Sequence, residues 1–155
     1  MILRHGTTAD ADAVADIDIA ARHEAMPTVR WVHPPEDARR WIRAVLLTTH
    51  EVWVAENNGN LIGYLALHDD WVAQLYVRPG FWRRGIGTAL LRRAKERRPD
   101  HLQLWCFQVN TRARAFYEAH GFSVVKLTDG RGNEEQEPDI LYAWSTPAPS
   151  SPSHA

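Results

Sequence analysis

The sequence predicts an α/β (α+β) domain with a mixed, mostly antiparallel central sheet and flanking helices. Three strand-like segments at 51–56, 61–67 and 71–77 follow one another with only turn residues between them, which predicts an antiparallel meander. A helical pattern over 88–98 then separates the third strand from a further strand at 101–107. Because a helix crosses over between these two strands, we expect them to be parallel.

The segment before the meander is predicted to contain an edge strand and two helices. Residues 2–5 suit the strand, and Thr7 or Thr8 suits the N-cap of a first helix that ends near residue 22. A second helix is predicted over 36–47. The inner stripes are predicted to be Val14, Ile17 and Ala21 on the first helix and Ala38, Trp41, Ile42 and Val45 on the second.

One helix and two strands are predicted after the parallel strand. Asn110 suits the N-cap of this helix, and Gly121 suits its left-handed C-terminal residue. The strands are predicted at 122–127 and 140–144, on either side of an acidic loop. Residues 146–155 are rich in proline and serine, which predicts a disordered tail.

Length and composition indicate a single domain over residues 1–145. A content of 45% hydrophobic and 24% charged residues is ordinary for a globular protein. The sequence has no run of about 18 apolar residues and no signal-like N-terminus, so we expect a cytoplasmic protein that does not bind membranes. The single cysteine, Cys106, cannot form an internal disulfide and is expected to be a buried strand thiol. The eight histidines are scattered, so no metal site is predicted.

Opposite charges gather in two segments although the net charge is only −1. Residues 78–98 carry eight basic side chains and one acidic side chain, whereas residues 129–139 carry five acidic side chains and Arg131. Such a chain could hold a polyanionic cofactor and a cationic substrate at different places. The alternative is that both segments are merely solvated surface.

A glycine pair marks the start of the helix that follows the third meander strand. Gly85 and Gly87 lack Cβ atoms, so backbone N–H groups from Arg84 to Thr88 can close on a ligand. Arg83 and Arg84 add fixed positive charge to a helix N-terminus, a combination that suits a pyrophosphate. The P-loop pattern is absent, and the third glycine of the dinucleotide motif is replaced by Leu90.

Two motifs resemble those of the GNAT superfamily of acyl-CoA-dependent N-acyltransferases. The run Arg83-Arg84-Gly85-Ile86-Gly87-Thr88, after the strand residues Gln74-Leu75-Tyr76-Val77, is similar to the family's Gln/Arg-x-x-Gly-x-Gly/Ala motif. A second segment is similar to the family's Asn-x-x-Ala-x-x-Phe-Tyr-x-x-x-Gly-Phe element. It is the run Asn110-Thr111-Arg112-Ala113-Arg114-Ala115-Phe116-Tyr117-Glu118-Ala119-His120-Gly121-Phe122. Trp82 departs from the pattern, because it stands where the motif usually has Gln or Arg. The resemblance implies a GNAT-like fold in which strands 71–77 and 101–107 splay apart.

The resemblance also implies acetyl-CoA (coenzyme A) as a co-substrate, without a metal. Its phosphates are expected on 83–88 and its pantetheine arm along 75–77, where freed backbone groups can bind it as a strand partner would. The residues expected to bind the cofactor are Leu75, Tyr76, Val77, Arg83, Arg84, Gly85, Ile86, Gly87, Thr88, Asn110 and Phe116.

Tyr117 and Asp70 are the candidate catalytic residues. The resemblance implies that Tyr117 protonates or hydrogen-bonds the departing sulfur. Several family members carry a carboxylate on the strand about where this chain has Trp71, so that assignment does not transfer to this chain. The adjacent Asp70 is the candidate base, acting through water, with Asp69, His68 and Glu137 behind it; the alternative is that solvent removes the proton. The two-helix region supplies weaker candidates for acceptor contacts, namely Glu24, Met26, Trp31 and His33.

The favoured function is acetyl transfer from acetyl-CoA to a primary amine of a cationic small molecule or peptide. The transfer is expected to be direct, through a tetrahedral intermediate. One alternative is a catalytically silent acyl-CoA-binding module, because Trp82 and the missing strand carboxylate both depart from the pattern. A nucleic-acid-binding domain is disfavoured by the near-neutral charge. Exposed tryptophans are consistent with a homodimer.

Overall fold

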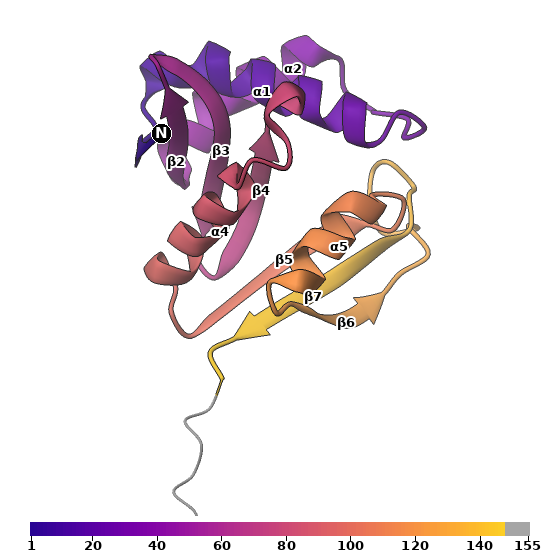
Figure 1. Ribbon diagram of the computed structural model, residues 1–155. Helices are drawn as coiled ribbons and strands as arrows, with labels where there is room; N and C mark the ends of the chain where they lie inside the picture. The colour runs from indigo at the N-terminus through magenta and orange to yellow at the C-terminus, as the bar shows by residue number, and fades with distance from the viewer. Residues whose placement is uncertain (148–155) are drawn as a thin grey trace, which may run out of the picture.

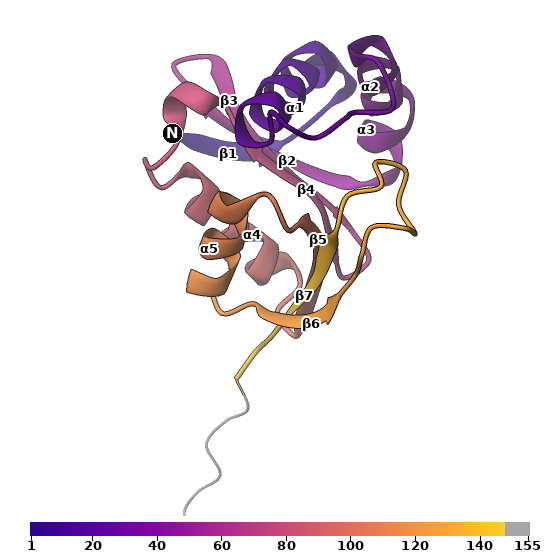
Figure 2. The ribbon, with the colours of Figure 1, turned by 90° about the vertical axis from the view of Figure 1, so that its right-hand side faces the viewer.

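The computed structural model describes residues 1–147, and within them it shows one seven-stranded sheet with helices on both faces (Figures 1 and 2). The strand order is β1-β2-β3-β4-β5-β7-β6. The strands are β1 (Ile2–His5), β2 (Glu51–Asn57), β3 (Asn60–His68), β4 (Trp71–Val77), β5 (His101–Phe107), β6 (Ser123–Leu127) and β7 (Asp139–Ser145). The predicted tail falls mostly in residues 148–155, which lie outside the described residues.

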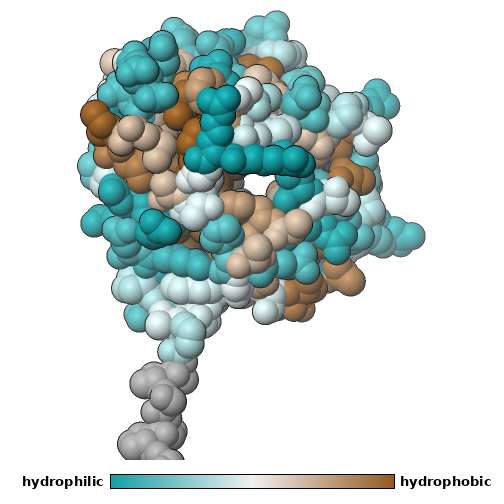
Figure 3. Space-filling model, viewed as in Figure 1, coloured by the Kyte–Doolittle hydropathy of each residue, from teal (hydrophilic) through white to brown (hydrophobic). Residues whose placement is uncertain are grey.

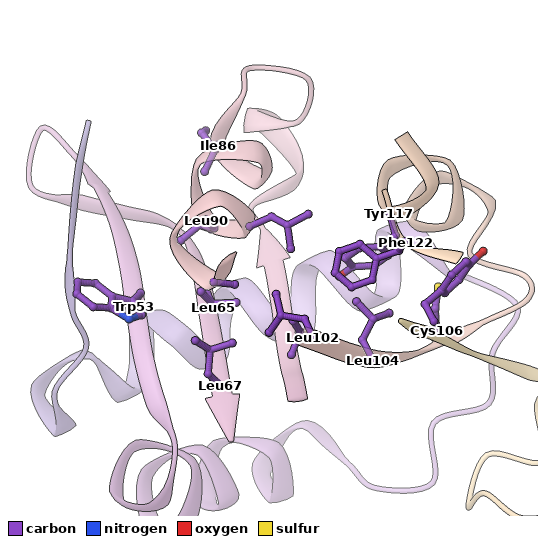
Figure 4. Close-up of a cluster of buried hydrophobic side chains, with 14 of the residues drawn as sticks. Trp53, Leu65, Leu67, Ile86, Leu90, Leu102, Leu104, Cys106, Tyr117 and Phe122 are labelled. Carbon is purple, nitrogen blue, oxygen red and sulfur yellow. The ribbon is translucent and has the colours of Figure 1, made fainter. Parts of the chain in front are cut away.

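The α-helices are α1 (Ala11–Ala25), α2 (Pro35–Trp41), α3 (Leu47–Thr49), α4 (Ile86–Arg97) and α5 (Thr111–Ala119). In Figure 2, α1 to α3 lie on one side of the sheet, and α4 and α5 lie on the other. Buried side chains form one hydrophobic core under α1 and a second under α4 and α5. Leu102, Leu104 and Cys106 of β5 point into the second core, toward Tyr117 and Phe122 (Figure 4).

The predicted fold class is confirmed, because β1 to β4 pair in antiparallel order and β4 pairs with β5 in parallel. The β2–β3 hairpin turns at Asn58 and Gly59, whose φ angles are 52° and 82°. Positive φ at both central residues is the requirement of a type I′ hairpin turn, which asparagine and glycine tolerate. The turn residues between the strands therefore encode the meander.

The predicted buried face of the second helix is partly wrong. Ile42 is buried as predicted, but Trp41 and Val45 are 39% and 37% exposed, and Leu46 is fully buried in their place. The cause is a π-helical segment, Ile42–Leu46, between α2 and α3. Its i→i+5 hydrogen bonds widen the turn, so the inward position moves from Val45 to Leu46.

Strands β4 and β5 pair only where both begin. Within the described sheet the single β4–β5 register pair is Trp71 with Gln103, and the N–H of Gln103 donates to the carbonyl oxygen of Asp70 at 3.0 Å. Beyond this point the two strands diverge (Figure 1). The expected splayed notch is therefore present, with β1 to β4 on one side and β5 to β7 on the other.

Candidate active site

A cavity of about 1080 Å³ fills the notch between β4 and β5. This volume lies at the upper end of the range for small-molecule sites. Figure 3 shows it as an opening between the two halves of the sheet, bordered in part by hydrophilic residues. Four predicted site residues line it, namely Leu75, Tyr76, Asn110 and Tyr117. Val77, Asp70, Phe116 and the loop 83–88 are not among its lining residues.

Residues 83–88, called the glycine loop below, lead into the N-terminus of α4 and leave backbone donors free there. The first backbone hydrogen bond of the helix runs from the N–H of Ala89 to the carbonyl of Gly85 at 3.0 Å, so the N–H groups of Ile86, Gly87 and Thr88 precede it. Gly85 has a φ of 79°, and a Cβ atom built on it would meet no atom within 4 Å. The loop therefore presents an open concavity of N–H groups, and this arrangement fits a diphosphate.

Gly87 and Thr88 also make the contact between α4 and α5. A Cβ atom on Gly87 would lie 3.4 Å from the ring of Phe116, which is tight for two packed groups. Thr88 Oγ1 lies 3.2 Å from Nε2 of His120. Phe116 therefore supports the glycine loop from the side of α5.

Three arginines surround the loop without a carboxylate partner. Arg83, Arg84 and Arg112 form no ion pair with an acidic residue of the described chain. Partial burial and the nearby charge of Arg83 lower the pKa of Arg112. Unpaired like charges held close together are the expected surroundings of an anionic ligand.

Trp82, the departure from the family motif, joins β4 to α5. Its Nε1 donates to the carbonyl oxygen of Val77 at 2.7 Å, and the guanidinium of Arg112 lies 3.9 Å from its ring centroid. The tryptophan therefore occupies the last carbonyl of β4 and places a cation from α5 beside the glycine loop.

Tyr117 projects from α5 into the core beneath the cavity (Figure 4). It is 8% exposed, and its ring lies 5.2 Å from the ring of Phe116 and 5.5 Å from that of Phe122. Within residues 1–147 its hydroxyl has no hydrogen-bond partner. Burial, and to a lesser extent the neighbouring Cys106 and Tyr76, raise the pKa of Tyr117. The phenol therefore stays protonated and is available as a donor.

Asn110 is the N-cap of α5, as predicted. Its Oδ1 accepts a hydrogen bond from the N–H of Ala113 at 3.1 Å, and the residue also lines the cavity. The cap fixes the first turn of the helix that carries Tyr117.

Asp70 lies at the closed end of the notch, where β4 and β5 pair. Its carboxylate accepts a hydrogen bond from Nε2 of Gln103 at 3.0 Å and contacts Nδ1 of His101 at 2.9 Å. These two groups, led by Gln103, lower the pKa of Asp70 although burial opposes them. The side chain therefore has two protein partners and a weakened affinity for a proton.

Two segments, 26–34 and 128–139, contribute lining residues to the side of the cavity where the resemblance implies the acceptor, which is called the acceptor side below. Met26 lines the cavity, whereas Glu24, Trp31 and His33 are not among its lining residues. Asp129 and Asp139 line it from the acidic loop. Nε2 of His33 lies 2.9 Å from Oε2 of Glu134, so an exposed side-chain contact links the two loops.

Asp18 is a site neighbour that the sequence interpretation missed. It is 4% exposed, it pairs with Arg22 at 2.7 Å, and it accepts a hydrogen bond from the hydroxyl of Tyr64. That hydroxyl also lies 3.1 Å from Oε1 of Gln74, which lines the cavity. Burial raises the pKa of Asp18. The signal was present, because Asp18 lies four residues after the buried Val14 and three before the buried Ala21, on the same face of α1.

Cys106 is buried beside the cavity, as expected. It is 6% exposed, and burial raises the pKa of its thiol to about 12. A thiol with that pKa is almost never a thiolate near neutral pH, so it is a poor nucleophile. Within the described residues no group of three or more His, Cys, Asp or Glu side chains is arranged to hold a metal ion. Over the same part of the chain, no helix combines the length and apolar character that crossing a bilayer requires.

Comparisons with known proteins identify the family of the chain. A family profile described as the acetyltransferase (GNAT) family matches residues 18–122. The peptidyl-lysine N-acetyltransferase YiaC of Escherichia coli is 32% identical over 126 residues, which cover 77% of this chain and 84% of YiaC. Apo-YjaB of Escherichia coli superposes with a TM-score of 0.78 at 19% identity, covering 94% of this chain and 99% of YjaB. The yncA structure from Salmonella typhimurium, solved with acetyl-CoA, has a TM-score of 0.71 at 21% identity, covering 100% of this chain and 99% of yncA.

Proposed function

Because the chain belongs to the GNAT acetyltransferase family and is an acetyl-CoA-dependent N-acetyltransferase, we propose that its acceptor is a primary amine on a cationic molecule, namely a lysine side chain of a peptide or protein. The observation that carries this proposal is the pair Asp129 and Asp139, which line the cavity on the acceptor side. Asp129 also pairs with Arg131 at 3.2 Å, Asp139 accepts hydrogen bonds from Thr128 and Asn133, and Lys126 lines the same cavity. The two carboxylates keep their negative charge in these contacts and are proposed to attract a cationic acceptor, while the arginines around the glycine loop are proposed to attract an anion. The relative YiaC is a peptidyl-lysine N-acetyltransferase, and this supports the same acceptor class.

Acetyl-CoA supplies an acetyl group activated as a thioester. We propose that the N–H groups of 86–88 bind its diphosphate and that Arg83 and Arg84 supply charge at the rim. Trp82 already occupies the carbonyl of Val77. The strand-like contact with the pantetheine arm therefore falls mainly to Leu75 and Tyr76, which line the cavity.

Tyr117 is proposed to donate a hydrogen bond to the sulfur that leaves. Its raised pKa makes complete loss of the phenolic proton costly, so we favour a donated hydrogen bond over full proton transfer. The absence of a competing partner for its hydroxyl within residues 1–147 supports this role. Asn110 and Phe116 are proposed to position α5 and the glycine loop with respect to each other.

The geometry favours solvent over Asp70 as the acceptor of the amine proton. Asp70 does not line the cavity, and His101 and Gln103 already contact both of its oxygens. A carboxylate with a lowered pKa is also a weaker base. We propose that water in the open notch takes the proton, and titration of the rate tests this assignment.

Direct transfer, without an acyl-enzyme, is proposed for the same site. The only cysteine of the chain, Cys106, is buried and has a raised pKa. A covalent route would need an activated nucleophile.

The nucleic-acid interpretation loses support, because Arg97 and Arg98 at the end of α4 pair with Glu51 at 2.7 and 3.2 Å.

A thiol-release assay with acetyl-CoA tests the acceptor class. The panel contains lysine peptides, the same peptides with norleucine in place of lysine, and neutral and cationic small amines. We expect thiol release with lysine peptides, loss of release with norleucine, and a lower KM for peptides with basic neighbours. Release with small amines alone would contradict the peptide acceptor, and binding of acetyl-CoA without release by any amine would indicate a silent module.

A further inference from the structure

A second, smaller groove lies beside the main cavity, across the start of β4 and β5. Its volume is about 390 Å³. Val72, Ala73 and Trp105 line both hollows, so the two adjoin each other. The remaining lining residues of this aromatic groove are His50, His68 and Trp71.

The aromatic groove opens on the acceptor side of the sheet. Leu102, Leu104 and Cys106 point toward α4 and α5 (Figure 4). Because side chains alternate along a strand, Trp105 points to the opposite face, where α1 to α3 lie. A molecule in the acceptor half of the cavity therefore has the groove beside it.

Flat rings dominate the walls of the groove. Trp105 is 48% exposed, which is unusual for a residue in the middle of an interior strand. The rings of His50 and His68 lie 4.9 Å apart, and Trp41 meets His50 edge-on at 6.1 Å. Exposed aromatic side chains in a concave surface favour an aromatic or large apolar ligand group.

The groove has fewer charged groups than the main cavity, although Nδ1 of its His68 lies 3.3 Å from a carboxylate oxygen of Asp69. No carboxylate, lysine or arginine is among its lining residues in the described chain. Partial burial, followed by the neighbouring His68, lowers the pKa of His50, which favours the neutral form of this imidazole. The carboxylates Asp129 and Asp139 line only the main cavity. The two hollows thus suit groups of different chemistry.

We propose that the aromatic groove binds an aromatic or large apolar side chain of the acceptor peptide, next to the lysine whose amine enters the main cavity. This inference rests on the proposed lysine acceptor and adds a sequence preference to it. The rival occupant is a second copy of the chain. The position of the groove next to the main cavity favours the peptide, because a peptide that extends from the cavity into the groove contacts Trp105 in both places.

Matched peptides test the groove. A parent peptide with one lysine among serines is compared with versions in which phenylalanine replaces serine at one flanking position at a time. We expect phenylalanine at one position to raise kcat/KM about tenfold over the parent, the size of a good aromatic contact. Trp105→Ala and His68→Ala are expected to bring this ratio close to one. The affinity for acetyl-CoA, measured by calorimetry, checks that both variants are folded.

Val125→Ala is the control variant. Val125 is 61% exposed on β6 and does not line either hollow, so the phenylalanine preference should persist in it. The proposed role of the groove would be wrong if the wild-type enzyme acetylated all peptides equally, or if the phenylalanine preference persisted in both Trp105→Ala and His68→Ala. Neither result would contradict the proposed lysine acceptor. If Trp105→Ala changed the sedimentation coefficient but not the kcat/KM ratio between the phenylalanine and parent peptides, the aromatic groove would instead bind a second copy of the chain. Failure to acetylate any lysine peptide would remove both proposals.

Discussion

Replacing Tyr117 with phenylalanine removes one hydroxyl group and tests the proposed contact with the leaving sulfur. In the folded protein this hydroxyl has no partner within residues 1–147, and the ring is packed between Phe116 and Phe122. The phenylalanine ring can keep these packing contacts. We therefore expect the free energy of unfolding to change by less than about 0.5 kcal/mol, because no protein hydrogen bond is lost.

The expected loss of turnover is much larger. A hydrogen bond to a charged group contributes about 1.5 to 3 kcal/mol, and each 1.36 kcal/mol of barrier changes a rate about tenfold. If Tyr117 donates to sulfur only as negative charge develops there, kcat should fall about 10- to 100-fold while the Kd of acetyl-CoA stays nearly constant. Because burial raises the pKa of Tyr117, kcat of the wild type should show no decline from ionisation of this phenol below its ordinary pKa of about 10.

Tyr142→Phe is the matched control. Tyr142 is fully buried, its ring centroid lies 6.4 Å from that of Tyr117, and its hydroxyl donates to Oε2 of Glu118 at 3.0 Å. This substitution removes a hydrogen bond to a carboxylate and should lower stability by about 1 to 2 kcal/mol. It should leave kcat within about twofold, because the lost group is not proposed to contact the substrate.

Stopped-flow thiol release at saturating acetyl-CoA and acceptor gives kcat, and urea unfolding followed by fluorescence gives stability. The two variants should show opposite patterns, with loss of rate in Tyr117→Phe and loss of stability in Tyr142→Phe. A near-normal kcat for Tyr117→Phe would remove the phenol from the mechanism. Equal losses of kcat in both variants would indicate disturbed packing of α5 in place of a missing donor.

Three further changes test the rest of the site. Gly85→Ala should lower stability by about 1 to 2 kcal/mol, because alanine disfavours the φ of 79°, and it should raise the Kd of acetyl-CoA in calorimetry. Gly59→Ala, at a φ of 82° in the distant β2–β3 turn, should lower stability in the same way but leave the Kd of acetyl-CoA unchanged. Asp70→Asn should leave the acidic limb of the rate profile unchanged if water accepts the amine proton, and a lost limb would restore Asp70 as the base. Glu51 titrates with a pKa of about 2, because hydrogen bonds from arginines and Trp53 outweigh its burial. Because its pKa is lowered in the folded protein, ionised Glu51 stabilises the fold above about pH 4.5. Glu51→Gln should therefore lower the free energy of unfolding by about 1 kcal/mol after solvent screening, and this loss should fade as the pH falls from 4.5 toward 2 in urea titrations. An equal loss at pH 2 and pH 7 would contradict the ion pair.

Local sequence was enough for the meander and the anion site. Asn58 and Gly59 specify their turn through their own backbone preferences. The glycine loop is built from consecutive residues, Gly85 to Thr88, and its N–H groups belong to the first turn of one helix. Neither feature needs a distant contact for its geometry, so both could be predicted from a short window.

Longer-range features could not be predicted in this way. The helical period predicted Trp41 and Val45 as buried, but a π-helical segment moved the inward position to Leu46. Whether a helix accommodates such a wide turn depends on how its neighbours pack, and the period of the sequence does not report it.

The acceptor side depends most on the tertiary structure. The main cavity and the aromatic groove are lined by β3, β4, β5, α5, β6, the loop before β7 and the residue before β2, and residues such as His50 and Trp105 are far apart in the chain. The sequence by itself predicted the open helix N-terminus at Gly85 to Thr88, because its backbone donors all belong to one helix turn. Only the divergence of β4 from β5 decided which side chains face the acceptor, because that surface exists only after distant strands have packed.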